Sequence, residues 1–311
     1  MLIKKVKRKL LSLYYYPYVM FNILQYVKGV ESNRYTIILP MAIGDFCYAL
    51  AYMRELCMKK ESEGKDILLV VYDKRKSLLT QYELDYPKIF IQKGTRESQI
   101  VDWIAYNRYL MKFARKHNIY TTVAYYETPE RKACKSCLDI SRYNIFKLEG
   151  KGHIVYPCVP NCEITSISDF DEVNNRIVIL NPYSNSLELK DNGLFEELSS
   201  FLHKKGYVLY TNVIPGQKIV KGTYPLACSI IELYNICKRI PLVISIRSGI
   251  IDYLISSPAH FFVIYEQDVS PKYRSIYALD AWQTNNVYET VYTDRSSVLT
   301  HLYDFINNNR L

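Results

Sequence analysis

Short apolar runs rich in β-branched residues alternate with amphipathic segments along most of this 311-residue chain, and this alternation constrains the fold more than any other feature. Eight runs have the composition of buried strands: 35–39, 66–72, 88–91, 120–126, 176–186, 207–212, 242–246 and 260–265. The segments between them repeat apolar residues every three or four positions, as helix faces do. Strands that alternate with helices predict an α/β protein built on parallel, doubly wound sheets.

The alternation is interrupted between residues 127 and 175, where prolines and glycines are frequent and apolar runs are few. We interpret this stretch as a connecting region. The sequence therefore predicts two Rossmann-like domains facing a cleft. The first spans 34–165 and includes most of the connector, and the second spans 166–311.

The connector contains candidate metal ligands. Two cysteine pairs, Cys134 with Cys137 and Cys158 with Cys162, resemble a four-thiolate zinc site with one wide spacer and a long central loop. The alternative is free thiols in a reducing compartment, which the lack of a recognisable cleavable signal favours. Asp169 and Asp171 have the spacing of a metal-binding carboxylate pair, but they follow no apolar strand, so we interpret them as solvated linker.

The positive charge of the chain is concentrated at its N-terminus. Residues 1–30 hold six of the 40 basic residues and none of the 31 acidic ones. Apolar residues share one face of a helix there, namely Leu2, Val6, Leu10 and Leu13. We predict that residues 1–33 are a membrane-interface segment whose residues 1–27 contact an anionic surface, and an ordinary docking helix is the alternative. Because the charge excess is local, nucleic acid is not an expected partner.

Residues 241–256 read PLVISIRSGIIDYLIS. This stretch predicts a strand to Ile246, a polar turn with Arg247, and a helix that begins with Ser248 as its cap. Such a junction directs unpaired N–H groups and the positive end of a helix dipole at an anion, and an arginine adds a bidentate charge. We infer a diphosphate site. The alternative is an ordinary turn with a solvated arginine.

A second junction of this kind lies at 35–57, where a strand leads through Gly44 and Asp45 into a helix. Asp45 is expected to point into the cleft that the strand ends define. A carboxylate in that position can act as general base toward a hydroxyl group. The alternative is that Asp45 is a helix N-cap and has no role in catalysis.

Four motifs occur in order along about two-thirds of the chain. They are IGD at 43–45, NPYSNS at 181–186 followed by Lys190, YTNVIPG at 210–216, and the helical spacing of 229–236 running into LVISIRSGIIDYL. Together they resemble GT-B glycosyltransferases, and more narrowly the bacterial heptosyltransferase-type family (glycosyltransferase family nine) that builds cell-surface polysaccharides. Residues 1–33 and 127–175 lie outside the resemblance.

The resemblance implies metal-independent, inverting transfer of a sugar from a nucleotide diphosphate donor to a hydroxyl of a lipid-linked glycan. The first domain would bind the acceptor, with Asp45 as base, and the second the nucleotide sugar, with Lys190 on the leaving phosphate. Arg247 and the amides of 248–250 would stabilise the charge on the departing diphosphate. The other residues expected to contact the donor are Gly44, Asn181, Tyr183, Ser184, Thr211, Ser248, Gly249, Ile250, Asp252 and Tyr265.

The turn at 247–252 departs from the D-S-G-P-x-H pattern of the family, because Arg247 replaces the acidic residue and Asp252 the histidine. An ADP-heptose donor is therefore not implied, and sugar and base stay open. Two alternatives are a nucleotide-sugar epimerase on the same fold and a non-catalytic scaffold of a polysaccharide assembly complex. We expect a cytoplasmic protein held at the inner face of the plasma membrane, with a nucleotide sugar as substrate and no cofactor.

Overall fold

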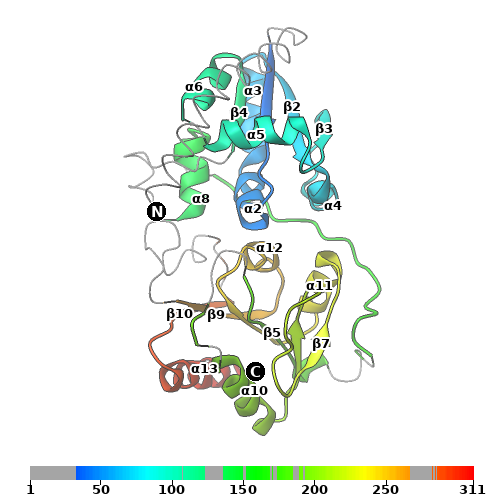
Figure 1. Cartoon of the computed structure of the whole chain (residues 1–311), viewed down its shortest axis with the longest axis vertical. Coiled ribbons are helices and arrows are strands. Elements are labelled where there is room, and N and C mark those ends of the chain that lie inside the picture. Colours follow the sequence, from blue (N-terminus) through cyan, green and yellow to red (C-terminus); the bar gives the residue numbers. More distant parts are fainter. Residues whose placement is uncertain are drawn as a thin grey trace. The chain divides into compact units, whose positions relative to one another are not determined.

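The computed structural model describes residues 33–106, 108–122, 136–149, 152–168, 170, 174–184, 189–191, 193–266, 282, 284 and 286–311. The chain forms two compact units that divide between Tyr156 and Pro157. Each unit contains one parallel sheet (Figure 1), which confirms the prediction of two doubly wound α/β domains. The predicted membrane-interface segment lies almost wholly outside the described residues. Among the residues that are described, no helix is long and apolar enough to span a bilayer.

The first unit is built on a four-stranded sheet with the order β3-β2-β1-β4. Its strands are β1 (Arg34–Ile38), β2 (Asp66–Tyr72), β3 (Lys88–Ile91) and β4 (Ile119–Thr121). Its helices are α2 (Ile43–Ala51), α3 (Met53–Ser62), α4 (Lys76–Leu79), α5 (Arg96–Tyr106), α6 (Arg108–Lys116) and α8 (Cys137–Asp139). Short 3₁₀ turns, η1 (Asp73–Arg75) and η2 (Thr80–Tyr82), and a π-helical turn, η3 (Ile140–Ile145), complete it.

The core of this unit explains why its strands read as continuous apolar runs. Ile38, Val70 and Ile91 of neighbouring strands pack with residues of α5 and α6, and β2 is buried along nearly its whole length. Strands covered on both faces have no solvent side on which polar residues would alternate. The register pairs Ile38 with Val70, so the loops that follow β1 and β2 leave the sheet at the same edge.

A partly buried ion pair attaches the connector to the helices of the first unit. The guanidinium of Arg142 in η3 donates to both carboxylate oxygens of Glu55 in α3, at 2.6 and 3.0 Å, and lies over the ring of Tyr52. Gly152 passes directly beside this group, and a Cβ at that position would lie 1.6 Å from Nη1 of Arg142. Only glycine leaves room for the guanidinium there.

Substitution Gly152→Ala is therefore expected to push Arg142 away from Glu55 and to lower the free energy of unfolding by about 2 kcal/mol. Glu55 is partly exposed, which keeps the loss below that of a fully buried pair. Urea unfolding followed by circular dichroism measures the loss. In a Glu55→Ala background the pair is already broken, so the same glycine substitution should add little; equal losses in both backgrounds would contradict this explanation.

The second unit is built on a six-stranded sheet with the order β10-β9-β8-β5-β6-β7. Its strands are β5 (Ile177–Asn181), β6 (Val208–Asn212), β7 (Tyr224–Leu226), β8 (Leu242–Ile246), β9 (His260–Tyr265) and β10 (Val287–Val291). Its helices are α10 (Leu194–Lys204), α11 (Ile230–Cys237), α12 (Ile251–Leu254) and α13 (Arg295–Asn309), with a 3₁₀ turn, η4 (Asn174–Arg176), before β5.

The order of these strands matches the dinucleotide-binding arrangement 3-2-1-4-5-6, read from β7 to β10. The winding direction reverses between β5 and β8, and both strands are buried at every residue. One face of the sheet packs on α10 and α13, whose apolar residues join those of β5, β8 and β9 in a single core. In open sheets of this order, ligands bind at the carboxyl ends of the two strands that flank the reversal.

We predicted that the second unit begins at residue 166, but the two units divide earlier, between Tyr156 and Pro157. The reason is that the last part of the connector packs on α11. Glu232 of α11 accepts hydrogen bonds from the amides of Thr165 and Ser166 at 2.8 and 2.9 Å. Asn235 and Lys238, farther along the same helix, donate to backbone carbonyls of the connector. The backbone amides and carbonyls of the connector therefore bind it to a helix of the second unit.

Candidate functional site

Four polar side chains form a hydrogen-bonded network at the switch point of the second sheet. The Nδ2 atom of Asn181, the last residue of β5, donates to the hydroxyls of Ser245 and Ser248 at 2.8 and 3.2 Å. Asn212, the last residue of β6, donates to Oδ1 of Asn181 at 3.0 Å. Asn181, Ser245 and Ser248 are buried and Asn212 is partly buried, so the polar groups of the three buried residues depend on one another for hydrogen bonds. It fixes the loops after three adjacent strands in one arrangement.

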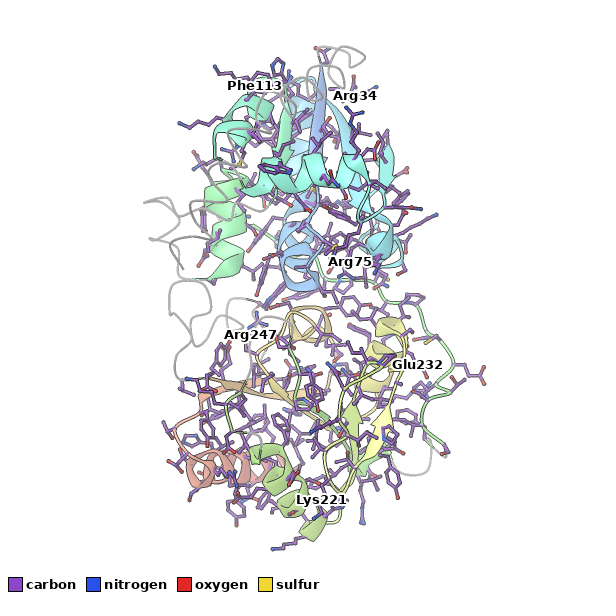
Figure 2. All side chains as sticks on the ribbon, in the orientation of Figure 1. Arg34, Arg75, Phe113, Lys221, Glu232 and Arg247 are labelled. Atoms are coloured by element: carbon purple, nitrogen blue, oxygen red, sulfur yellow. The ribbon has the colours of Figure 1, made fainter. Side chains whose placement is uncertain are left out.

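Arg247 follows β8 directly (Figure 2) and forms a buried ion pair with Asp252. Its Nη2 atom donates to both carboxylate oxygens at 2.7 and 2.9 Å, and Nη1 donates to the carbonyl of Ser248 at 2.6 Å. The sequence predicted two separate donor contacts, with Arg247 as a cation offered to a diphosphate. The structure shows in addition that the two residues pair with each other and that this pair closes the turn at 247–252. Their contact with a diphosphate stays a prediction.

The same turn departs from the prediction in its secondary structure. Helix α12 has only four residues and begins at Ile251, with Ile250 rather than Ser248 at the capping position. The Ser248 hydroxyl is occupied instead by Asn181. Gly249 and Ile250 are partly exposed, whereas Arg247 and Ser248 are buried. The middle of the turn, residues 249 and 250, is therefore accessible to solvent, while its buried ends fix its position.

Thr211 and Tyr265 were expected to flank the nucleotide, and both have almost no exposed surface. The Thr211 hydroxyl bonds with Thr223 and accepts from the amide of Val220, which attaches the β6–β7 loop. The Tyr265 hydroxyl donates to the buried carboxylate of Glu289 on β10. Desolvation, together with that neighbour, raises the pKa of Tyr265 well above its usual value.

Lys190 and Tyr183 lie in the loop after β5, and their side chains form the solvent-accessible part of the site. Lys190 is exposed, and its backbone amide donates to Oε2 of Glu266 at 3.2 Å. Tyr183 and Ser184 are half-buried, and the Tyr183 hydroxyl donates to the carbonyl of Lys218. Residues 185–188 lie outside the described residues. The predicted donor-side residues thus divide into an exposed set and a buried set that supports it.

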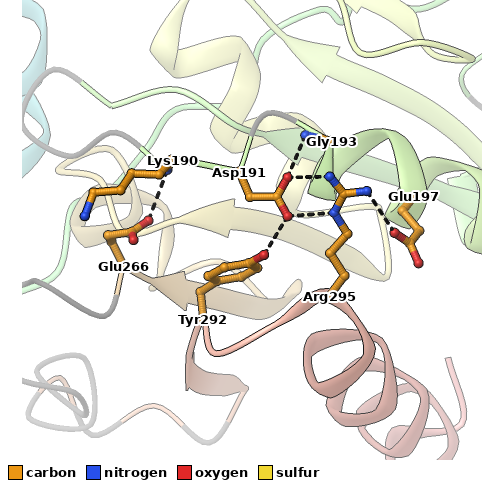
Figure 3. A network of polar contacts seen from close by, with 7 residues as sticks. All are labelled: Lys190, Asp191, Gly193, Glu197, Glu266, Tyr292 and Arg295. Atoms are coloured by element: carbon orange, nitrogen blue, oxygen red, sulfur yellow. Dashed lines mark hydrogen bonds and ion pairs between the residues drawn. The ribbon is translucent and has the colours of Figure 1, made fainter.

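Asp191, next to Lys190, is bound by Arg295 at two points and also accepts from Tyr292 and Gly193 (Figure 3). These donors, Arg295 foremost, hold the pKa of Asp191 well below its usual value. Because the folded state favours the carboxylate, this stabilisation is complete above the ordinary aspartate pKa of about 3.9. It is lost as the pH falls from there toward the lower pKa of the folded protein.

Urea unfolding of the wild type and of Asp191→Asn is therefore expected to differ most near neutral pH, and the difference should shrink as the pH falls below about 4. Midpoints measured at about pH 7 and about pH 3 test this sign, since the asparagine does not titrate. A difference between the two proteins that is the same at both values would show that the carboxylate charge does not stabilise the fold.

In the first unit, Asp45 lies in the first turn of α2, at the carboxyl edge of its sheet. It is half-buried, and Gly44 beside it is buried. The alternative prediction of a helix cap is wrong, because the capping position is occupied by Ala42, whose extended backbone precedes the helix. A carboxylate in the first turn still interacts favourably with the helix dipole. The loop before α2 is fixed by Arg75, whose Nε donates to the carbonyl of Met41 at 2.6 Å.

Ser245 and Asn212 belong to the switch-point network and were not predicted as site residues. Both are polar residues near the end of an otherwise apolar strand, LVISI and VLYTN. The same signal marked Asn181 in the sequence. A rule that examines the last two positions of every buried strand would have found all three.

The zinc site stays a prediction, because the structure describes only two of its four thiols. Cys134 and the side chain of Cys137 lie outside the described residues, and so do Asp169 and Asp171. Cys158 is an exposed free thiol and Cys162 a half-buried one that accepts from Asn235. Across the described ranges, no group of three or more potential metal ligands comes together.

No protein-family model matches this sequence, and no curated protein does at the level searched. Solved structures do match. The glycosyl transferase family 9 protein from Veillonella parvula DSM 2008 aligns with a TM-score of 0.62 and 12% identity over 90% of this chain and 99% of its own.

Two Escherichia coli enzymes also align. ADP-heptose LPS heptosyltransferase II aligns with a TM-score of 0.59 and 10% identity over 89% of this chain and 100% of its own. Heptosyltransferase WaaC, solved with ADP, aligns with a TM-score of 0.54 and 9% identity over 88% of this chain and 99% of its own. The chain therefore has the fold of the glycosyltransferase family 9 and heptosyltransferase structures, as its sequence motifs implied.

Proposed function

We propose that this protein is a glycosyltransferase that moves a sugar from a nucleotide diphosphate donor to a hydroxyl of a cell-surface glycan. The observation that carries the proposal is the polar network of Asn181, Ser245 and Ser248 at the switch point of a 3-2-1-4-5-6 sheet. That is the position at which such sheets bind nucleotides. The likeness to solved glycosyltransferases over most of the chain supports it.

On the donor side, the diphosphate lies over the partly exposed turn at 249–250, next to the end of β8. Lys190 supplies the positive charge. It lies at the end of the neighbouring strand β9, because its backbone amide donates to the carboxylate of Glu266, which follows that strand. Arg247 acts with Asp252 to fix the turn, since its charge is already compensated. Tyr183 and Ser184 line the pocket, and the buried Thr211 and Tyr265 support it from beneath.

On the acceptor side, Asp45 is the general base. The acceptor hydroxyl attacks the anomeric carbon while Asp45 takes its proton, and the bond between that carbon and the phosphate oxygen breaks with its electron pair going to the phosphate. In-line attack inverts the configuration at the anomeric carbon. Lys190 and the amides of the 248–250 turn stabilise the charge that develops on the leaving diphosphate, so the reaction as proposed needs no metal ion.

The acceptor in this proposal is a lipid-linked oligosaccharide or polysaccharide at the inner face of the plasma membrane. The support for this placement is the sequence of residues 1–27, basic on one side and apolar on the other. Each basic residue near an anionic bilayer contributes about 1 kcal/mol of attraction. The segment brings the enzyme to a substrate that diffuses in the same plane.

A panel of nucleotide sugars, incubated with the protein and a mixture of lipid-linked acceptors and read by mass spectrometry, tests the proposal. Transfer shows as a glycan that gains one sugar together with release of the nucleoside diphosphate. An epimerase would change the donor in the absence of any acceptor. Donor that stays intact with every acceptor would count against both enzymes and favour a scaffold.

Nucleoside diphosphates are also expected to raise the melting temperature of the protein. A ligand at one hundred times its dissociation constant stabilises the folded state by about 2.7 kcal/mol. Differential scanning fluorimetry with ADP, UDP, GDP, CDP and dTDP measures the shift and indicates the base. The matching nucleosides are the control, and they should shift the melting temperature much less because they lack the diphosphate.

A further inference from the structure

The loop that joins β5 to α10 crosses the carboxyl edge of the second sheet. It leaves β5 at Asn181, and its residues 190 and 191 contact segments at the ends of β9 and β10. In the sheet, β8 lies between β5 and β9. Lys190 therefore lies at the end of β9, next to the strand end that carries the 247–252 turn.

Asp191 holds this loop in place. Its Oδ1 accepts from Nη2 of Arg295 at 2.6 Å and from the amide of Gly193 at 2.9 Å. Its Oδ2 accepts from Nε of Arg295 and from the hydroxyl of Tyr292, both at 2.6 Å. Figure 3 shows the four donors converging on one carboxylate. A carboxylate bound at two points by a guanidinium is fixed in orientation as well as in position.

The two side chains that bind Asp191 come from the edge of the sheet formed by β10. Tyr292 follows β10, and Arg295 is the first residue of α13. A glycine at position 193 leaves room for the guanidinium of Arg295, since a Cβ there would lie 2.2 Å from Nη2 of Arg295. Asp191 is thus bound to residues at the end of a strand and at the start of a long helix.

The charges have a second consequence. Asp191 is the direct neighbour of Lys190, and an uncompensated carboxylate there would repel a diphosphate. Two hydrogen bonds from Arg295 compensate the charge of this carboxylate, so Asp191 repels an anion at Lys190 less than a lone carboxylate would. The ion pair therefore fixes the residue next to Lys190, and it compensates the negative charge of Asp191, which would otherwise repel a diphosphate.

We propose that Asp191, held by Arg295 and Tyr292, is a positioning residue that sets Lys190 against the leaving diphosphate. This inference rests on the proposed function. It predicts that the carboxylate of Asp191 matters for turnover only through Lys190, although it also stabilises the fold.

Asp191→Asn keeps the size of the side chain and removes the charge, and we expect it to lower kcat/KM for the donor about tenfold or more, the scale of one charge-assisted contact. The matched control is Glu197→Gln, which removes the other carboxylate bound to Arg295, at 3.4 Å, and does not touch the loop. Its kcat/KM should stay within about twofold of the wild type. Tyr292→Phe removes a single hydroxyl and should lower kcat/KM less, in the same direction.

A double-mutant cycle separates positioning from folding. In a Lys190→Ala background, Asp191→Asn should change kcat/KM by less than about twofold, while its effect on the melting temperature persists. Equal losses in both backgrounds would overturn the inference, as would an Asp191→Asn enzyme that melts earlier but turns over normally. If Asp191→Asn fails to fold, the cycle is run with Tyr292→Phe. A wild type that transfers no sugar overturns the proposed function itself, and this outcome is distinct because it is seen before any variant is made.

Discussion

Asp45→Asn is expected to lower kcat about a thousandfold while the protein stays folded. General base catalysis by a positioned carboxylate contributes on the order of 10²–10⁴ to the rate, and asparagine cannot accept the proton. Asp45 lies in the first turn of α2 and is not its cap, and the amide loses the favourable interaction with the helix dipole, which is worth up to about 1 kcal/mol. Steady-state kinetics with the donor found in the panel measure kcat, and urea unfolding measures stability.

Asp73→Asn is the matched control for this experiment. Asp73 begins the turn after β2, the strand beside β1, and it is exposed. Its loss removes a carboxylate from the same edge of the sheet, so kcat should stay within about twofold if the effect at Asp45 is chemical. The donor KM of Asp45→Asn should also stay near the wild-type value, because the residue acts on the acceptor. Turnover at the wild-type rate in Asp45→Asn would remove it from the mechanism.

Arg247→Met is expected to lower the free energy of unfolding by about 3–5 kcal/mol, the range observed when one partner of a buried ion pair is removed. The side chain of Asp252 is 1% exposed, so its carboxylate would be left without its charge partner and without water. The cost comes from this uncompensated charge more than from the lost attraction. Urea unfolding of the second unit, followed by the near-ultraviolet signal of its aromatic residues, provides the measurement.

The double variant Arg247→Met with Asp252→Leu tests that account, because it removes both charges and fills similar volume. Its stability should recover most of the loss, as it does where buried pairs are replaced by apolar residues. Nucleoside diphosphate binding by this double variant then reports on the turn itself. Binding that stays at the wild-type level would show that neither charge contacts the diphosphate. A double variant as unstable as Arg247→Met alone would refute the ion-pair account of the loss.

Most of the strands could be predicted from the sequence, because a strand buried on both faces must be apolar and these runs are short and β-branched. The bounds of β2, β3, β8 and β9 agree with the predicted runs. Strands β7 and β10 were missed. The first is three residues long and contains Pro225, and the second includes Glu289, whose burial depends on Tyr265 of the neighbouring strand. Neither has the apolar run that marks the others.

The candidate site shows the same division. The sequence by itself determined which residues stand at strand ends, since Asn181 ends one apolar run and Arg247 follows another, and residue order alone places them at one edge of a parallel sheet. Only the tertiary structure decided which of these side chains pair with each other. Arg295 compensates Asp191 because segments distant in sequence meet at that edge, and such long-range pairing leaves no local pattern in the chain. Asp252 is only five residues from Arg247, but the conformation of the turn decides that the two side chains pair.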